Sequence, residues 1–454
     1  MLVSLFNKLA EYLWGPPMII LLLLTGTYLT IRSGFFQLAK VGFILKSTLG
    51  AILSRQATRV REGKPGVLTP FQAISTALAG TVGNGNIAGV ATAIATGGPG
   101  AVFWMWVVAV LGMMTKMVEV TLGVHYREVR EDGSTYGGPM YYIEKGLGKN
   151  WKPLAVFFSI STVIGALGTA VWVQPHTMGL ALKSTFGIHP MATSVVASAL
   201  TGAVIIGGFK RIGKFCEYIT PFMCLFYIAG GLVVILVNVS RIPEAFGLIF
   251  RHAFAPAPAV GGFAGAAVAA AIRRGMARGM FSNEAGMGSS PMVHATVVTD
   301  DPVRQGLWGA FEVFADTIVV CTITALSIMC TGVWTSGKSG VDLTIMAFHS
   351  VWGWIGTIIV TLGVLLFAYS TMVGYAFEYE TALNYLFGPR VIPFMRVVYL
   401  IPPIIAAGKP LEFAWTVVDV STGLMGLPNL VALFALAGVF VRLLKDFRGR
   451  EGIS

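Results

Sequence analysis

The hydrophobic positions of this chain neither alternate nor keep to one helical stripe. They form long runs of the length that a transmembrane helix needs. This pattern predicts an all-α polytopic membrane protein with about eleven transmembrane helices. A shorter segment, 411–424, contains Glu412 and Asp419, so we expect it to be a surface helix. The predicted spans lie at about 16–30, 68–96, 101–124, 154–183, 190–208, 217–237, 261–298, 303–330, 353–386, 391–407 and 427–444.

Two of these runs are interrupted by glycine and polar residues. Residues 79–89 read AGTVGNGNIAG, and residues 281–290 read FSNEAGMGSS. Irregular backbone is tolerated at membrane depth only where it is buried in protein or lines a cavity. Paired broken helices at corresponding places in two halves of a chain are typical of the binding sites of secondary transporters. We therefore expect two broken helices that meet at a binding site.

The order of the spans predicts an internal repeat. Without the first span, ten remain, and the broken helices are the first and the sixth. An odd number of spans in each half inverts one half relative to the other, which gives a 5+5 inverted repeat. We expect four parts: an N-terminal transmembrane helix with a basic cytoplasmic stretch (1–66), a first repeat (67–237), a second repeat (259–446) and a cytoplasmic tail (447–454).

The distribution of charged residues predicts how the chain is oriented in the membrane. Only 12% of the residues are charged and 55% are hydrophobic, yet the net charge is +11. The basic residues are dispersed in short clusters between spans, which argues against a nucleic-acid site. With the stretch 32–64 inside, 22 of the 32 Lys and Arg lie on the cytoplasmic side, six lie outside and four lie within spans. This asymmetry predicts an outside N-terminus and an inside C-terminus.

The first break can be interpreted in two ways. Its glycines could allow close helix packing, and Gly85 with Gly89 has the small-xxx-small spacing. Packing does not require Asn84 and Asn86, whose amides are costly in lipid. The functional interpretation is that unwinding frees carbonyls for a cation and N–H groups for a carboxylate. No strand precedes the glycines, which excludes a dinucleotide-binding loop.

The second break contains Glu284, a carboxylate at membrane depth. Such a residue is a functional hypothesis by default, but it could also hydrogen-bond the freed backbone N–H groups. Both interpretations stay open here. Arg278 lies six residues earlier and serves either as an outer gate or as a side chain that snorkels. Lys116 and Glu119, spaced i,i+3, are expected to form a structural ion pair.

Three polar side chains in other spans can likewise have either a structural role or a role in binding. Ser370 and Thr371 are adjacent hydroxyls at depth, which either bond to a carbonyl one turn earlier or offer oxygen to a hard cation. Gln174 precedes Pro175 and either caps a kink or faces a cavity.

The sequence lacks the features of an enzyme. The four cysteines show no CxxC spacing, and the six histidines show no spacing typical of metal ligands. No Ser/His/Asp arrangement and no HExxH motif are present. We therefore expect no enzymatic activity and no organic cofactor. Without an ATP-binding motif, transport must be driven by an ion gradient.

Four long motifs carry a resemblance to a known family over nearly the whole chain. With them, the sequence resembles the alanine or glycine:cation symporters, whose fold is that of the amino acid-polyamine-cation superfamily. The resemblance implies a sodium-coupled importer of small neutral amino acids, chiefly alanine and glycine, with D-alanine left open. It also implies a multi-pass protein of the prokaryotic cytoplasmic membrane, with membrane lipid around it and with no nucleic-acid or obligate protein partner. The motifs are residues 83–93, 97–106, 137–141 and 278–289.

A fainter likeness to the neurotransmitter:sodium symporters implies roles for single residues. This chain departs from that family's pattern at two positions. It has Met372 and Glu284 where the neurotransmitter:sodium symporters have hydroxyl residues. The substrate residues implied are Gly83, Asn84, Gly85, Asn86, Gln174, Phe281, Ser282 and Thr371. The sodium ligands implied are Ala79, Val82, Asn86, Ala368, Ser370 and Thr371.

These observations lead to one main prediction and one rival. The main prediction is a secondary active symporter that works by alternating access, with sodium and an amino acid bound between two half-bundles near the membrane midplane. The rival is a proton-coupled carrier of small amino acids in which Glu284 carries the proton.

Overall fold

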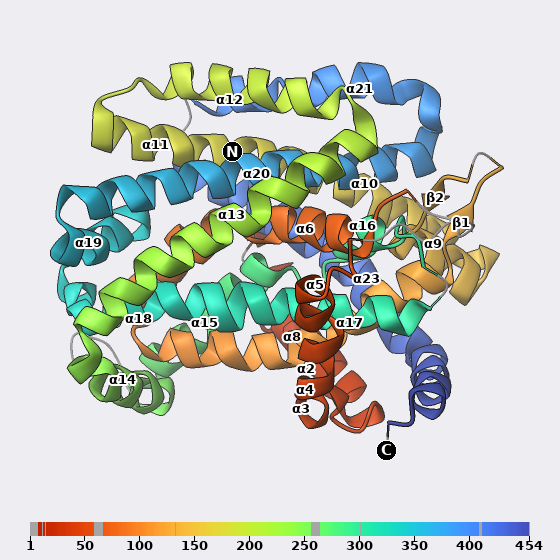
Figure 1. The fold of residues 1–454 in the computed structure, drawn as a ribbon, viewed down its shortest axis with the longest axis horizontal. Helices are drawn as coiled ribbons and strands as arrows, with labels where there is room; N and C mark the ends of the chain where they lie inside the picture. The colour runs from red at the N-terminus through yellow and green to blue at the C-terminus, as the bar shows by residue number, and fades with distance from the viewer. Residues whose placement is uncertain are drawn as a thin grey trace.

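The computed structural model describes residues 8–10, 12–13, 15–58, 67–131, 133–255, 264–299, 301–407 and 411–453. Apart from one two-stranded hairpin, the regular elements in these ranges are helices, and most of the long ones run roughly along the longest axis of the molecule (Figure 1). The hairpin pairs β1 (Glu128–Val129) with β2 (Thr135–Tyr136) in antiparallel register.

The helices of the first half of the chain are α2 (Pro16–Arg32), α3 (Phe36–Ala39), α4 (Val41–Ser47), α5 (Leu49–Leu53), α6 (Pro70–Thr81), α7 (Val90–Gly97), α8 (Gly100–His125), α9 (Pro139–Tyr142), α10 (Lys152–Gly168), α11 (Gln174–Phe186), α12 (Pro190–Ile205), α13 (Gly208–Val237) and α14 (Ile242–Phe254). Those of the second half are α15 (Ala264–Asn283), α16 (Ser290–His294), α17 (Pro302–Val313), α18 (Thr322–Thr331), α19 (Gly340–Trp352), α20 (Trp354–Phe387), α21 (Ile392–Tyr399), α22 (Pro402–Ala406) and α23 (Leu411–Glu451). π-Helical segments lie at Gly85–Gly89, Ile143–Leu147, Thr169–Val173 and Phe314–Cys321, and short 3₁₀ turns at Lys149–Trp151, Val239–Arg241, Val333–Thr335 and Pro389–Val391.

Both predicted helix breaks are present. Helix α6 begins with a capping box in which the side chains of Thr69 and Gln72 each accept a bond from the other's backbone N–H. It ends at Thr81, Val82 is extended, and after a π-helical turn the chain continues as α7. Helix α15 stops at Asn283, and α16 begins at Ser290. The unwound part of the second break is therefore narrower than the predicted segment 281–290, because Phe281 and Ser282 are still helical.

The protein is a multi-span membrane protein. Seven helical stretches in the described ranges are long and apolar enough to cross a membrane, and most coincide with predicted spans. The total of eleven stays a prediction, because short and broken helices need other evidence. The seven stretches are Gly100–His125, Lys149–Phe186, Gly208–Val237, Pro302–Thr331, Trp354–Phe387, Pro389–Ala406 and Val418–Glu451.

The predicted surface helix at 411–424 is wrong. Residues 411–451 form the single helix α23, which also takes in most of the predicted tail 447–454. The charge of Asp419 misled the prediction, because its partly exposed carboxylate lies 3.9 Å from the guanidinium of Arg278 on another helix. A paired charge does not mark the end of a membrane helix.

Two further helices, α14 and α19, lie in segments predicted only as connections. Both are short and amphipathic, which explains why a search for long apolar runs missed them. Helix α14 buries Ala245, Ile249 and Ala253, spaced four residues apart, and packs against α8. Helix α19 packs against the beginning of α20.

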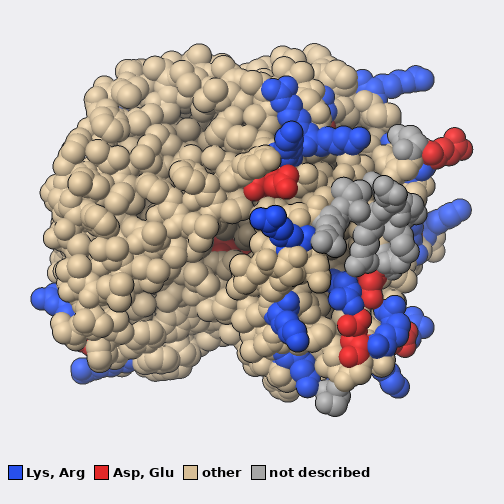
Figure 2. Space-filling model, in the orientation of Figure 1, with Lys and Arg blue, Asp and Glu red and all other residues tan. Residues whose placement is uncertain are grey.

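The first broken helix crosses α20 at very short distance. A Cβ on Gly374 would lie 2.8 Å from the backbone N of Gly80, so only glycine fits there. Helix α8 packs against α15 and α17. On the face shown in Figure 2, the Lys and Arg side chains gather mainly toward the end that carries β1, β2 and the C-terminus. The last six residues of the predicted basic stretch 32–64, residues 59–64, lie outside the described ranges.

Candidate functional site

The first break leaves backbone groups without their usual helical partners. The N–H of Gly83 donates to Oδ1 of Asn86 at 2.9 Å, and the N–H of Asn84 donates to Oε1 of Gln174 at 3.4 Å. In a continuous helix these two N–H groups would bond the carbonyls of Ala79 and Gly80. Those carbonyls are therefore released at the end of α6, as the functional interpretation requires.

Three other helices place side chains against this break. A Cβ on Gly83 would lie 2.7 Å from Oγ1 of Thr371 in α20 and 3.5 Å from Nε2 of Gln174. A Cβ on Gly85 would lie 3.2 Å from the ring of Phe281 in α15. The glycines are thus required by the close approach of these side chains, and helix packing alone does not explain them.

Asn86 reaches across to a residue that sequence reasoning missed. Its Nδ2 donates to Oδ1 of Asp316 at 2.6 Å, and the hydroxyl of Ser282 donates to Oδ2 at 2.8 Å. Thr317 adds a third donor at 2.7 Å. Asp316 lies in the π-helical segment 314–321, is fully buried and has no ion pair with Lys or Arg among the described residues. A carboxylate inside the apolar run 303–330 is the signal that could have found it.

The structure brings only some of the predicted sodium ligands together. Ala79 and Ala368 pack in one buried cluster, and Val82 ends α6. The hydroxyls of Ser370 and Thr371 both donate to the carbonyl of Phe367, at 2.9 and 2.8 Å. The structural interpretation of these hydroxyls is therefore present, yet Thr371 also touches the first break. No described contact connects Ser370 with that break.

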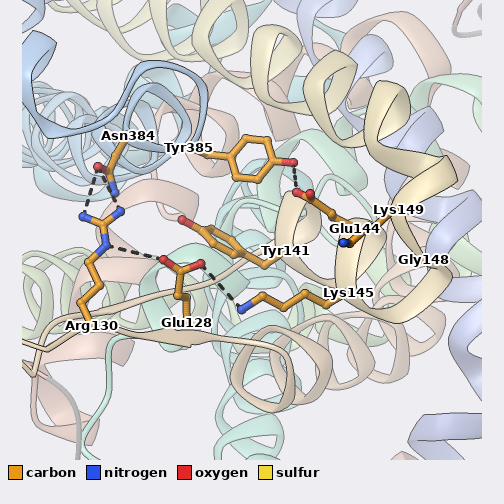
Figure 3. Close-up of a pocket in the computed structure, with 9 residues that line it drawn as sticks. All are labelled: Glu128, Arg130, Tyr141, Glu144, Lys145, Gly148, Lys149, Asn384 and Tyr385. Carbon is orange, nitrogen blue, oxygen red and sulfur yellow. Dashed lines mark hydrogen bonds and ion pairs between the residues drawn. The ribbon is translucent and has the colours of Figure 1, made fainter.

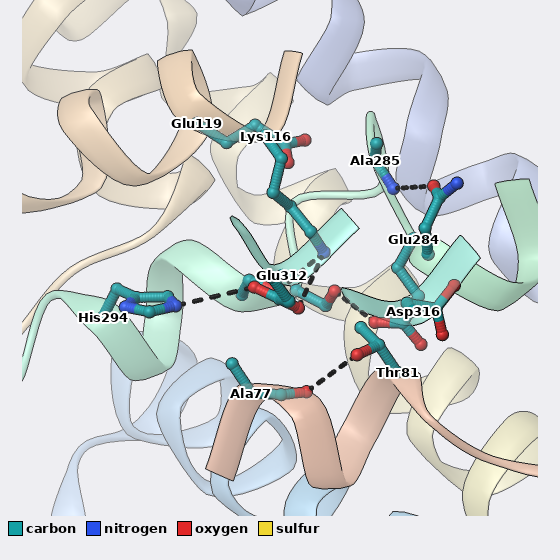
Figure 4. Close-up of polar contacts among 12 residues, drawn as sticks. Ala77, Thr81, Lys116, Glu119, Glu284, Ala285, His294, Glu312 and Asp316 are labelled. Atoms are coloured by element: carbon teal, nitrogen blue, oxygen red, sulfur yellow. Dashed lines mark hydrogen bonds and ion pairs between the residues drawn. The ribbon is translucent and has the colours of Figure 1, made fainter. Parts of the chain in front are cut away.

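The second break is held by a carboxylate other than the expected one. Glu119 lies beside Lys116 on α8 (Figure 4), and its Oε1 accepts the N–H groups of Gly286 and Gly288 at 3.0 and 3.1 Å. It also accepts a bond from Asn429 at 2.5 Å. The structural role considered for Glu284 thus belongs to Glu119, which caps the freed N–H groups.

Glu284 faces a different set of partners. Its backbone has φ of +55°, a left-handed conformation that is rare outside glycine. Its carboxylate accepts bonds from the hydroxyls of Ser289, at 2.5 Å, and of Tyr375 in α20. Glu284 therefore joins the second break to α20.

The predicted ion pair between Lys116 and Glu119 is wrong. Nζ of Lys116 lies 3.2 Å from the carboxylate of Glu312 in α17 and donates to Ser290 at 2.7 Å. His294 lies 3.5 Å from the same carboxylate. The i,i+3 spacing allowed an ion pair on one helix, but the two side chains stabilise different neighbours.

The surroundings of Arg278 in α15 favour one of its two interpretations. Its guanidinium lies 3.9 Å from the carboxylate of Asp419 in α23 and 5.9 Å from the centre of the Phe281 ring. Arg273 and Arg274, by contrast, are exposed. The pairing of Arg278 across two helices, directly beside Phe281, supports a gate at this side of the breaks.

A separate pocket of about 570 Å³ lies at the basic end of the molecule (Figure 3). Tyr385 of α20 donates to Glu144 at 2.5 Å, and Arg130 contacts Asn384 at 3.4 Å. The pocket therefore lies between α20 and the segment 128–149. The two contacts connect α20 with that segment beside the pocket. Its lining residues are Glu128, Arg130, Tyr141, Glu144, Lys145, Gly148, Lys149, Asn384 and Tyr385.

The fold is shared with known transporters. The crystal structure of MhsT in complex with L-phenylalanine matches with a TM-score of 0.56 and 14% identity, over 84% of this chain and 99% of that one. At this level of identity the match shows the fold alone.

Sequence relatives define the family. The sodium/alanine symporter AgcS of Methanococcus maripaludis is 42% identical over 98% of this chain and 97% of its own length. The probable sodium/glutamine symporter GlnT of Bacillus subtilis is 37% identical over 96% of this chain and 89% of its own length. The model of the sodium:alanine symporter family matches residues 1–452. The chain therefore belongs to the sodium:alanine symporter family, a family of membrane transporters and not of enzymes.

Proposed function

We propose that this protein imports small neutral amino acids, chiefly alanine and glycine, together with sodium by alternating access across the cytoplasmic membrane. The observation that carries the proposal is the convergence of Asn86, Ser282 and Asp316 beside the first helix break. Oxygen ligands and a buried negative charge are what a hard cation requires. The names of the two sequence relatives pair sodium with an amino acid, which supports the same coupling.

The substrate is proposed to bind at the first break through the groups that every amino acid carries. The bond from the N–H of Asn84 to Gln174 is long at 3.4 Å, so a substrate carboxylate can replace it at low cost. Gly83 and Gly85 let the substrate approach the backbone closely. The ring of Phe281, which is nearly buried beside Gly85, then limits the volume left for the substrate side chain.

Sodium is proposed to bind at two places around this substrate. Asp316 supplies side-chain oxygen at one place, and Asn86 adds its Oδ1 there when that oxygen leaves the Gly83 N–H and turns toward the ion. At the other, the released carbonyls near the end of α6 face Thr371 of α20, since Thr371 lies against Gly83. Both places join the first broken helix to another helix, so that bound sodium favours one arrangement of these helices over the other. Ala79, Val82, Ala368 and Ser370 remain the proposed partners of Thr371.

The repeats 67–237 and 259–446 are proposed as the inverted halves, with the N-terminus outside. The gathering of basic residues toward the end that carries β1 and β2 supports a cytoplasmic position for that end (Figure 2). No obligate protein partner is proposed. The rival, proton coupling through Glu284, is supported by the two hydroxyls that bond this buried carboxylate.

Uptake of labelled alanine into proteoliposomes, with sodium and proton gradients imposed separately, tests the proposal. A sodium gradient alone should drive accumulation at equal pH. Accumulation that follows the pH gradient, ignores sodium and is lost in Glu284→Gln would establish the rival instead.

Thr371→Val tests the second sodium place, because it keeps the shape and removes the oxygen. The sodium concentration for half-maximal uptake should rise several-fold. Thr381→Val is the matched control, since Thr381 lies on the same helix and donates to Phe377 at 2.8 Å in the same way. If both variants keep the sodium dependence of the wild type, the hydroxyl of Thr371 has only a structural role.

A further inference from the structure

The interior around the two breaks carries more negative than positive groups. Five carboxylates in the described ranges are at most 2% exposed, whereas Lys116 is the only Lys or Arg buried to that extent. An ionised carboxylate without a partner is costly at membrane depth. Each of the five must therefore be stabilised by hydrogen bonds, by an opposite charge or by a bound cation or proton. The five are Glu119, Glu284, Glu312, Asp316 and Glu378.

Four of these carboxylates have partners, and the fifth does not. Glu119 accepts backbone N–H groups, Glu312 pairs with Lys116, Asp316 accepts three donors, and Glu284 accepts two hydroxyls. Glu378 forms no hydrogen bond or ion pair with any described residue, and its Oε2 is buried. Of the five, it is the one whose negative charge no hydrogen bond or ion pair with a described residue would compensate.

Glu378 lies at the contact between α20 and the first broken helix. Its Oε1 would be 3.5 Å from a Cβ on Gly80, beside the close crossing of Gly80 and Gly374. Tyr375, one turn earlier on the same face of α20, donates to Glu284. The other titratable groups that act on Glu378 or lie in this region are Glu284 of the second break, Lys116 of α8, Glu312 of α17, His294 of α16 and Tyr399 of α21.

The position of Glu378 along α20 selects the side from which a proton comes. Thr371 marks the level of the first break, and Glu378 lies about two turns further toward Phe387. That end of α20 meets the loop with β1 at the pocket of Figure 3. On the proposed topology it is the cytoplasmic end. A rearrangement that separates α6 from α20 at this end would therefore bring water to Glu378.

We propose that Glu378 is a proton-binding site that exchanges with the cytoplasm and controls the closing of α6 onto α20. The packed contact accepts only the neutral carboxylic acid. When α6 separates from α20, the O–H bond breaks and the proton passes to cytoplasmic water, leaving a hydrated carboxylate. Before α6 can pack again, the carboxylate takes a proton back from the same side. No proton crosses the membrane, so this site regulates the cycle and does not couple it.

The direction of the effect follows from linkage. The packed state holds one more proton than the open state, so raising the cytoplasmic pH favours the open state and slows the return step. When the packed state is fully protonated and the open state fully deprotonated, each pH unit lowers the ratio of packed to open protein about tenfold. This inference rests on the proposed alternating-access symport, but the two fail in different experiments.

The test uses proteoliposomes with right-side-out insertion, in which internal and external pH are set independently and alanine exchange is measured in saturating sodium. Raising the internal pH from about 6.5 to about 8.5 should slow exchange at least several-fold, whereas the same external change should have little effect. Glu378→Gln should remove the internal pH dependence. Glu380→Gln is the matched control, because Glu380 lies on the same helix but pairs with Arg396 at 2.7 Å.

Three results would overturn the inference. The first is equal sensitivity to internal and external pH in the wild type, which needs no variant and so remains informative if Glu378→Gln does not fold. The second is a pH dependence in Glu378→Gln that matches the wild type. The third is alanine-driven acidification of the lumen that disappears in Glu378→Gln, since the proton would then be transported. Loss of sodium-driven uptake at clamped pH would instead contradict the proposed function.

Discussion

Nδ2 of Asn86 and Oδ1 of Asp316 lie 2.6 Å apart, although 230 residues separate them in the chain. The contact joins the first broken helix to the π-helical segment that follows α17. Both side chains are fully buried. A cation bound here would therefore touch both halves of the chain at once, which is how ion binding can favour one arrangement of the halves.

Removing the charge of Asp316 should weaken sodium binding without removing the side chain. In Asp316→Asn we expect the sodium concentration for half-maximal alanine uptake to rise about tenfold or more, because a neutral amide is a poorer ligand for a hard cation. Asp301→Asn is the control, since Asp301 caps the beginning of α17 through Arg304 N–H at 3.0 Å. Unchanged sodium dependence in a folded Asp316→Asn protein would remove Asp316 from the sodium site.

Truncating Phe281 should widen the range of substrates. Each methylene that the ring excludes accounts for roughly 1 to 3 kcal/mol of discrimination. Phe281→Ala should therefore admit valine or leucine in a competition assay, with weaker binding of alanine. Phe222→Ala, at an exposed position of α13, should leave selectivity unchanged. If the Phe281 variant transports alanine and gains no larger substrate, another residue sets the size limit.

A methyl group at Gly374 should separate α6 from α20. The added Cβ would lie 2.8 Å from the backbone N of Gly80, and overpacking of this kind costs roughly 1 to 3 kcal/mol. Gly374→Ala should lower the midpoint of thermal unfolding and reduce uptake. Gly438→Ala, in α23 with no atom near the added Cβ, should be neutral or slightly stabilising. Equal unfolding temperatures for the two variants would show that the crossing is looser than described.

The predicted topology can be tested with single cysteines. Arg59 of the predicted cytoplasmic stretch lies outside the described residues, so Lys210 in α13 serves as the cytoplasmic position. Lys210→Cys and Lys338→Cys should react with a membrane-impermeant thiol reagent from opposite sides. The native cysteines give little background, since three of the four are buried. Labelling of both positions from one side would contradict the model with eleven spans.

Sequence reasoning predicted the elements whose signal is local. Glycine and asparagine inside apolar runs indicated both breaks, because the lipid environment leaves few alternatives for such residues. Gln174, Phe281 and Thr371 were expected at one substrate site; all three lie against the first break, and their role in binding stays a prediction.

Partners distant in sequence could not be predicted in the same way. Glu119 and Lys116 are adjacent on one face of α8, yet each is stabilised by a different helix, and no local pattern reports that choice. Asp419 resembled a surface residue because its partner Arg278 lies 141 positions earlier in the chain. Asp316 could be seen in the sequence as a charge within an apolar run. Its place beside the first break could not be predicted, because its partner Asn86 is distant in the chain.

The carboxylate of Glu119 makes the two breaks unequal. At the second break, a carboxylate supplied by α8 already accepts N–H groups that could otherwise attract the acid group of an amino acid. At the first break, only amide side chains hold the corresponding positions. On the proposed function, a bound amino acid therefore has its carboxylate toward residues 83–85, because the N–H groups of the second break are already bonded to Glu119.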